Sequence, residues 1–180
     1  SLVTQREIDS DTESYATALR AGLRQSPDVI LVGEMRDSET IETVLTAAET
    51  GQMVLSTLHT TGAANTINRI LDSFPSNQQM QIRVQLSMVL RAVVSQQLIP
   101  SVNGALVPAF AIMVLTPAIR HLIRASNIHQ IDSALFPGHA LGMTTLDHSI
   151  FALSTKGTIA PATALHPIVA LYALRRKIQA

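Results

Sequence analysis

The chain has 180 residues, of which 47 % are hydrophobic and only 3 % aromatic, so aliphatic side chains must build its core and intrinsic disorder is not expected. It contains no Cys, which excludes a disulfide framework, a thiolate zinc site and a cysteine nucleophile, and which favours a cytosolic protein. No cluster of Lys and Arg is large enough for nucleic acid, and no apolar stretch reaches the roughly 18 to 20 residues of a membrane span.

The distribution of charge divides the chain near Gly51. The formal net charge is zero, but ten of the 13 acidic residues lie before Gly51, so the beginning is acidic and the remainder basic. Two interpretations stay open. Copies of the chain could pair head to tail, or the two halves could simply carry solvated faces of opposite charge.

The first predicted elements are a short strand, a helix and a longer buried strand. Leu2 to Ile8 is expected to be the short strand, and Ser10-x-x-Glu13 is expected to cap the helix, which ends before Pro27. Asp28 to Gly33 is an apolar run rich in β-branched residues. This pattern predicts a central strand that is buried on both faces of a parallel sheet.

Helix and strand alternate in the next segment. Ser38 to Thr50 is expected to be a helix that ends at Gly51, where glycine would close it in the left-handed conformation. Met53 to Leu58 is expected to be a strand, and Ala63 to Phe74 a helix. The alternation predicts a parallel α/β architecture.

A long helix and two strands are predicted after Phe74. Ser76-x-x-Gln79 is expected to cap the helix, which reaches about Gln97. The strands are expected around Leu98 to Val102 and Leu106 to Leu115, joined at Asn103-Gly104.

From Pro117 onward the apolar spacing predicts helices only. The last of them is expected over Ile168 to Ile178. We therefore expect a boundary near Leu115, with an α/β part over residues 1–115 and a helical part over residues 116–180.

Polar clusters follow the two strands of the predicted parallel sheet. In open α/β sheets, ligands bind outside the carboxyl ends of the strands, and a carboxylate placed there is how nucleotide hydrolases hold Mg²⁺ and its waters. The pattern alone also fits a structural histidine at a strand end and a solvated helix face that carries two arginines, and both are common in proteins. The residues concerned are Glu34, Arg36 and Asp37 after the first strand, Thr57, His59 and Thr60 after the second, and Arg20 and Arg24 on the preceding helix.

Residues 18–75 resemble the Walker B and His boxes of the secretion and type IV pilus ATPase superfamily. In this chain their sequence is ALRAGLRQSPDVILVGEMRDSETIETVLTAAETGQMVLSTLHTTGAANTINRILDSFP. The resemblance implies a RecA-like parallel sheet with flanking helices, here without the phosphate-loop segment, followed by a helical C-terminal subdomain. It further implies a homo-hexameric ATPase that uses ATP and Mg²⁺.

The resemblance also implies roles for individual residues. In the family, the residue matching Glu34 orders Mg²⁺ and its water near the γ-phosphate, and the histidine matching His59 senses that phosphate, so both are expected to be catalytic. The arginines that match Arg20, Arg24 and Arg36 serve subunit contacts and neutralise phosphate charge. Nucleotide or subunit contacts are implied in the same way for Asp37, Thr57 and Thr60.

A second resemblance favours retraction motors over assembly motors. Thr116 to Arg124 resembles the AIRNLIRE signature of pilus retraction ATPases, and Gly142 to Asp147 is similar to the GMQTLD stretch that follows it. The lack of Cys agrees, since assembly and type II secretion ATPases typically carry a four-cysteine zinc module. The implied partner is the inner-membrane pilus platform protein, and the implied location is the cytoplasm, peripheral at the inner membrane. Motor coupling is implied for Ala118, Ile119, Arg120, Leu122, Ile123 and Arg124.

The sequence also departs from the family pattern. These residues contain no GxxxxGK[ST] phosphate loop and no Asp box, so this chain alone is expected not to hold ATP in the family's way and to be inactive. Leu106, Ala111 and Ala125 stand where the family commonly has Arg, Glu and Glu. Two alternatives therefore remain: a truncated, non-catalytic homologue that serves as a ring or platform partner, and a pilus-assembly or type II secretion ATPase.

Overall fold

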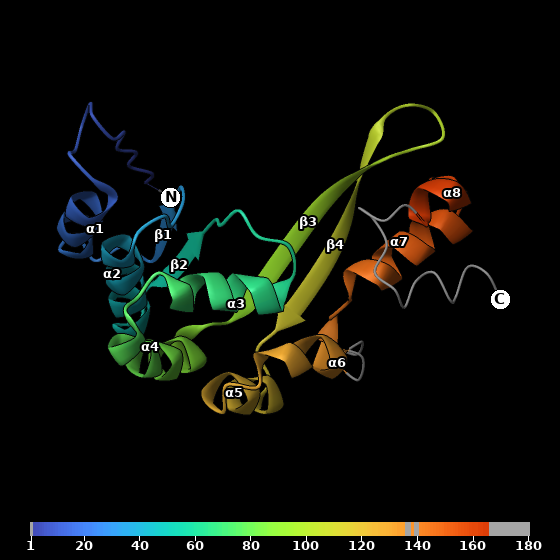
Figure 1. Cartoon of the computed structure of the whole chain (residues 1–180). Helices are drawn as coiled ribbons and strands as arrows, with labels where there is room; N and C mark the ends of the chain where they lie inside the picture. The colour runs from blue at the N-terminus through green and yellow to red at the C-terminus, as the bar shows by residue number, and fades with distance from the viewer. Residues whose placement is uncertain (1, 136–137, 139–140, 166–180) are drawn as a thin grey trace. The chain divides into compact units, whose positions relative to one another are not determined.

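The computed structural model describes residues 2–135, 138 and 141–165, and its architecture is α/β (Figure 1). The chain divides into two compact units, which are described separately below. The first unit comprises residues 1–59 and 69–90, and the second comprises residues 60–68 and 91–180.

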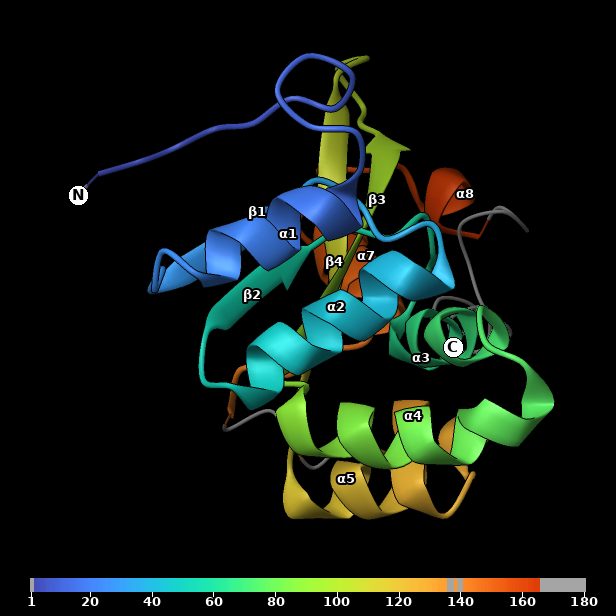
Figure 2. The same ribbon diagram turned by 90° about the vertical axis from the view of Figure 1, so that its left-hand side faces the viewer.

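The first unit is built on a parallel pair of strands connected by a helix. The strands β1 and β2 pair in register from Val29↔Met53 to Val32↔Ser56. The connecting helix α2 lies with α1 over one face of this pair, and Figure 2 views the unit from that side. The bounds are α1 Tyr15–Leu23, β1 Val29–Val32, α2 Ser38–Glu49, β2 Met53–Ser56 and α4 Ser76–Val89, while α3 Ala63–Asp72 begins in the second unit and ends in the first.

Helix α2 forms as the sequence predicts, because its apolar residues recur at helical spacing and its ends are capped. Ile41, Leu45 and Ala47 are almost fully buried, and Val44 packs with the strand residue Val32. The helix ends before Gly51, whose φ of 102° is the left-handed conformation that favours glycine. The connection between the parallel strands is therefore an amphipathic helix that buries its apolar face.

The prediction that β1 is buried on both faces is wrong for this chain. Val29 and Leu31 are 55 % and 74 % exposed, and their partners Met53 and Leu55 are 59 % and 46 % exposed. Side chains alternate between the two faces of a strand, so these four residues share the face opposite the helices. A two-stranded sheet with helices on one side leaves that face open.

The beginning of the chain also differs from the prediction. Leu2 to Ile8 does not form a strand, and Ile8 makes only an isolated bridge to Thr12. Helix α1 is capped by Ser14, whose hydroxyl accepts a hydrogen bond from the Thr17 amide at 3.1 Å, and not by the expected Ser10-x-x-Glu13. The physical reason is a turn, in which Asp9 has a φ of 67° and the Asp11 carboxylate accepts from the Glu7 amide. This turn includes Ser10, the first residue of the expected capping box.

The second unit contains a long antiparallel hairpin. Strands β3 (Ala92–Pro100) and β4 (Leu106–Val114) pair over their whole length, and Gly104 has a φ of 83° in the turn between them. The predicted turn at Asn103-Gly104 is confirmed. Asn103 supports it, since its side-chain oxygen accepts from the Ala105 amide at 3.2 Å.

The predicted helix to Gln97 is too long. Helix α4 ends at Val89, and Leu90 has an extended conformation with a ψ of 134°. The residues after it, including Val93 and Val94, join the ladder with β4, where β-branched side chains pack well. The expected Ser76-x-x-Gln79 cap is also absent, because Pro75 occupies the N-cap position and the side-chain Nε2 of Gln79 donates to the Phe74 carbonyl instead.

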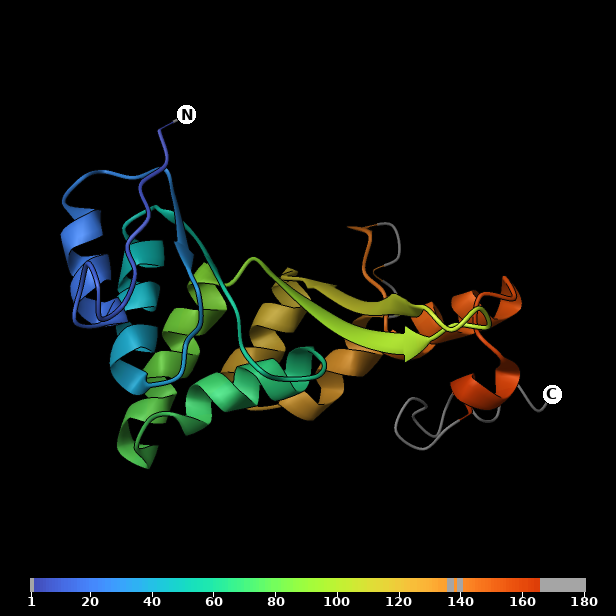
Figure 3. The same ribbon diagram turned by 90° about the horizontal axis from the view of Figure 1, so that it is seen from above.

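Short helices follow the hairpin and cover part of it (Figure 3). Helix α7 packs on β4, and the Ser149 hydroxyl accepts a hydrogen bond from the Phe110 amide at 3.0 Å. The buried cluster at this end joins both elements and consists of Ile99, Ala109, Ile150, Ile159 and Ala164. The bounds are α5 Pro117–Arg124, η1 Ile128–Gln130, α6 Ile131–Leu135, α7 Leu146–Thr155 and α8 Pro161–Ala164.

Two expectations about this region are not decided by the fold. The predicted helix over Ile168 to Ile178 lies outside the described residues. The predicted domain boundary near Leu115 stays a prediction, although the compact units group the β3–β4 hairpin with the helices that follow it. Within the described ranges, every helix is too short or too polar to cross a bilayer.

The core of the second unit gives a first prediction. Ile150 is fully buried in the cluster that it forms with Ile99 of β3 and Ala109 of β4. Ile150→Ala should therefore lower the free energy of unfolding by about 2 to 5 kcal/mol. Thr155→Ala on the same helix is the control, because Thr155 is exposed and its change should stay within about 0.5 kcal/mol. Urea denaturation followed by circular dichroism measures both. Equal midpoints for the two variants would show that this cluster is not a core.

Candidate functional site

The chain segments that leave β1 and β2 stay joined beyond the last strand pair. The Met35 amide donates a hydrogen bond to the Thr57 carbonyl at 3.1 Å. The Thr57 hydroxyl donates to the Gly33 carbonyl at 2.5 Å. Both neighbours of Glu34 in the sequence are therefore held by Thr57, the residue that follows β2, so the two segments leave the sheet side by side.

Glu34 is the centre of a small charged cluster at this edge. Its Oε2 lies 2.7 Å from Arg36 Nε and 3.6 Å from His59 Nε2. The Glu34 side chain is only 21 % exposed, whereas those of Arg36 and His59 are 74 % and 92 % exposed. The expectation that polar residues from both strand ends gather at one edge is confirmed for these three residues, and their catalytic roles stay predictions.

The electrostatics of the cluster follow from the short contact. The hydrogen bond that Arg36 donates to Glu34, together with the attraction between the two charges, raises the pKa of Arg36 above its ordinary value. Arg36 is thus a permanent cation beside the carboxylate. An incoming phosphate and the Glu34 carboxylate would compete for the same guanidinium fork.

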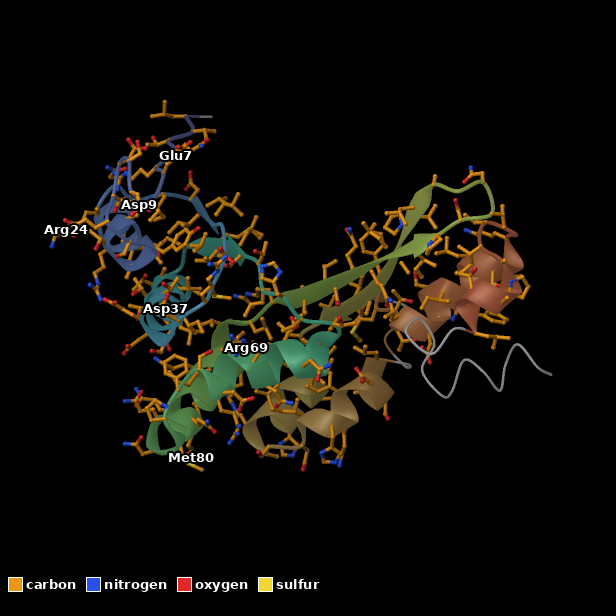
Figure 4. The ribbon with its side chains drawn as sticks, turned by 45° about the horizontal axis from the view of Figure 1, so that its top comes forward. Glu7, Asp9, Arg24, Asp37, Arg69 and Met80 are labelled. Atoms are coloured by element: carbon orange, nitrogen blue, oxygen red, sulfur yellow. The ribbon has the colours of Figure 1, made fainter. Side chains whose placement is uncertain are left out.

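Asp37 has a local structural task that the sequence interpretation missed. Its Oδ1 accepts from the Thr40 amide at 2.8 Å, and its Oδ2 accepts from the Thr40 hydroxyl at 2.9 Å. Asp37 is therefore the N-cap of α2, and Figure 4 shows it at the start of that helix. The signal was present in the sequence, because an Asp directly before an amphipathic run is a preferred cap.

The two arginines of α1 lie on its surface. Arg20 pairs with Glu39 of α2 at 2.8 Å, and both side chains are about 60 % exposed. Arg24 is the exposed C-cap of α1, and Figure 4 shows it on the side away from the strands. Their predicted nucleotide or subunit contacts stay predictions, since the structure gives Arg20 a partner on the neighbouring helix.

Thr60 belongs to the second unit, where it supports the start of α3. Its hydroxyl lies 2.8 Å from that of Thr66, which also donates to the Gly62 carbonyl. The Gly62 amide donates to the hydroxyl of Ser95 in β3 at 2.8 Å. These bonds fix Thr60 to its own unit, and its predicted nucleotide or subunit contact stays a prediction.

The signature helix α5 has the predicted amphipathic form. The Thr116 hydroxyl caps it by accepting from the Ile119 amide at 3.3 Å. The inward residues are Ile119 and Ile123, both fully buried, with Leu122 half-buried; Ala118 and Arg124 are exposed, and Arg120 is half-buried. Of the three departures, Leu106 is 60 % exposed, Ala111 is buried in β4, and Ala125 is the C-cap of α5.

The described residues do not gather three or more His, Cys, Asp or Glu side chains that could hold a metal ion. Glu34 supplies one partly buried carboxylate. A single carboxylate of this kind suits a Mg²⁺ ion held through its water, whose other ligands come from elsewhere, because Mg²⁺ usually keeps several waters and binds phosphate oxygens.

A parallel strand pair with a connecting helix, a carboxylate after one strand and a histidine after the next place two polar side chains at the carboxyl edge, where α/β proteins bind their ligands. The sequence profile of one family, described as type II/IV secretion system protein, matches residues 3–147. The chain belongs to this family.

Its relatives include pilus proteins. The chain is 52 % identical over 158 residues to the type IV pilus retraction ATPase PilT of Pseudomonas aeruginosa, which covers 88 % of the chain and 46 % of the relative. It is 51 % identical over 165 residues to a twitching motility protein of Neisseria gonorrhoeae, covering 91 % of the chain and 44 % of that relative.

A solved structure of the pilus retraction motor PilT with bound ADP superposes with a TM-score of 0.86 at 45 % identity. The superposition covers 97 % of this chain and 49 % of the other. The α/β fold is therefore that of PilT-like ATPases and is consistent with part of a RecA-like domain. The chain spans about half the length of the curated relatives it matches.

The N-cap gives a second prediction. Asp37→Ala should destabilise the first unit by about 0.5 to 2 kcal/mol, because two hydrogen bonds to Thr40 are lost. Asp37→Asn keeps a hydrogen-bond acceptor at the same position, so its loss of stability should be only a few tenths of the loss expected for Asp37→Ala. Thermal unfolding of both variants measures the difference, and equal losses would show that the carboxylate acts through its charge and not as a cap.

Proposed function

We propose that this chain is part of a homo-hexameric motor ATPase that hydrolyses ATP to retract type IV pili. The observation that carries the proposal is the contact between Glu34 and His59, 3.6 Å apart at the carboxyl edge of a parallel strand pair, in a fold shared with an ADP-bound retraction motor. The proposed setting is the cytoplasmic side of the inner membrane, with the pilus platform protein as partner.

The strand-end residues divide the chemistry between them in this proposal. Glu34 holds a water close to the γ-phosphate, because its carboxylate is partly buried and fixed from both sides of the backbone. His59 is 92 % exposed and reaches outward to the phosphate, where one hydrogen bond can report whether the phosphate is present. Arg36 neutralises negative charge beside them. Mg²⁺, when bound with ATP, neutralises phosphate charge and orients the γ-phosphate.

Retraction is favoured over assembly by the second unit. The identity with the retraction ATPase extends over 158 residues and so includes the α5 signature helix as well as the strand-end site. In α5, one face is buried and Arg124 is exposed, an arrangement that suits a helix passing force to a neighbour. The proposed coupling residues are Ala118, Ile119, Arg120, Leu122, Ile123 and Arg124.

A non-catalytic role is the second candidate function. Its support is the departures from the family pattern at Leu106, Ala111 and Ala125, where the family commonly has charged residues. A protein of this kind would pack into a ring or bind the platform without turnover. Turnover by the complete protein separates the two functions.

The site gives a third prediction, for the complete ATPase. Glu34→Gln should reduce ATP turnover by roughly 100-fold or more while leaving assembly and nucleotide affinity nearly unchanged, because the amide keeps the shape and loses the charge. His59→Ala should reduce turnover by a smaller factor. Steady-state phosphate release and nucleotide titration measure these effects.

Glu42→Gln is the matched control, because it makes the same chemical change at an exposed position of α2 and should leave turnover unchanged. Parental turnover in Glu34→Gln would make Glu34 an ordinary strand-end carboxylate and would overturn its proposed catalytic role.

The signature helix gives a fourth prediction. Replacing Arg120 and Arg124 by Ala in the complete ATPase should leave turnover within about two-fold, because α5 lies in a different unit from Glu34 and His59, while twitching motility falls sharply. Lys156→Ala, an exposed cation of the same unit, is the control. Normal motility in cells that express and assemble the double variant would reduce α5 to a packing element.

A further inference from the structure

Thr57 occupies a special place at the edge of the parallel pair. It is the first residue after β2, and its backbone and side chain each make one hydrogen bond to the segment that leaves β1. The backbone carbonyl accepts from Met35, and the hydroxyl donates to Gly33. These two partners are the residues immediately before and after Glu34.

The two bonds matter because the regular strand pairing has already ended. The last paired residues are Val32 and Ser56. Beyond them, a strand-end loop has no ladder to fix it, and a carboxylate on such a loop moves with its backbone. Through Thr57, the two segments stay in contact as far as Met35, three residues beyond the end of β1. His59 lies only two residues after Thr57. One residue thereby sets the separation between Glu34 and His59, 3.6 Å at their closest atoms.

The effect of Thr57 is local, because its side chain is exposed and contributes little to the core. A hydrogen bond in water contributes modestly to global stability. The hydrogen bond of Thr57 matters here because it fixes the position of the Glu34 segment. A misplacement of about 1 Å in a reacting group can lower the rate by up to roughly 100-fold. The hydroxyl is the atom that matters. Serine retains it, and valine has the same shape without it.

We propose that Thr57 is a positioning residue, which acts through Gly33 and Met35 to hold the Glu34 carboxylate against His59. The nucleotide or subunit contact expected for Thr57 from the sequence stays a prediction, and the second arm of the experiment below distinguishes a nucleotide contact from the positioning role. The catalytic part of the inference rests on the proposed function, so the experiment has one arm that does not depend on ATP hydrolysis.

The first arm uses the 180-residue chain and measures amide hydrogen exchange by NMR. Thr57→Val should speed exchange of the Met35 amide by about five-fold or more, because the second bond that holds the segment is gone, while amides within β1 and β2 keep their wild-type rates. Thr46→Val makes the same change on the exposed side of α2 and should leave Met35 unaffected. Unchanged exchange at Met35 in Thr57→Val overturns the inference.

The second arm uses the complete ATPase. Thr57→Val should lower kcat by about 10-fold with the KM for ATP within two-fold, and Thr57→Ser should restore most of kcat. His59→Ala should cost much less in the Thr57→Val background than in wild type, because the positioning is already lost. Thr46→Val is again the control.

The outcomes separate cleanly. A kcat for Thr57→Val equal to that of Thr46→Val overturns the positioning role, and a raised KM with unchanged kcat makes Thr57 a nucleotide contact instead. If the complete wild-type protein hydrolyses no ATP, the proposed function fails, and the exchange arm still decides whether Thr57 holds the Glu34 segment.

Discussion

The site depends on one constraint, the in-register parallel pairing of β1 with β2. Parallel strands end at the same edge of a sheet, so the residues that follow them are brought together however far apart they lie in the sequence. Here the pairing from Val29↔Met53 to Val32↔Ser56 places Glu34 beside His59, 25 residues later in the numbering. A shift of one residue would turn the side chains of β1 to the other face and separate the two groups. The helix α2, capped by Asp37, keeps the connection short enough for that register.

Most of the elements could be predicted because their signals are local. The β-branched run of β1, the helical spacing of α2 and the Asn103-Gly104 turn each specify their structure through nearest neighbours, and all three elements form, although β1 is buried on one face only. The errors arose where two local signals competed. Ser10 and Ser14 are both good helix caps, and only the turn around Asp9 decides between them. The end of α4 was misplaced because its pairing partner, β4, lies further along the chain.

The candidate site could be predicted in position but not in its connections. That Glu34 and His59 share an edge follows from strand order alone, and the contact confirms it. The task of Thr57 did not follow, because it depends on which nearby backbone group its side chain reaches. The N-cap role of Asp37 was missed, although an Asp directly before an amphipathic run is a preferred cap. The pairing of Arg20 with Glu39 likewise depends on how α1 crosses α2, which periodicity does not specify. Contacts between separate segments, such as Thr57 with Gly33 and Arg20 with Glu39, are thus the part of a polar cluster that composition and spacing do not show.

The open face of the strand pair has a practical consequence for anyone who purifies this chain. Val29, Leu31, Met53 and Leu55 form a compact apolar block that faces water, on a sheet of only two strands. Such surfaces adhere to one another and to chaperones, and short sheets of this size have little stability to spare. Self-association of the isolated chain will therefore increase as its concentration rises. Leu31→Lys would reduce this self-association, because Leu31 is 74 % exposed on the open face. It should have little effect on Glu34, because Leu31 lies within β1, before the strand-end residues.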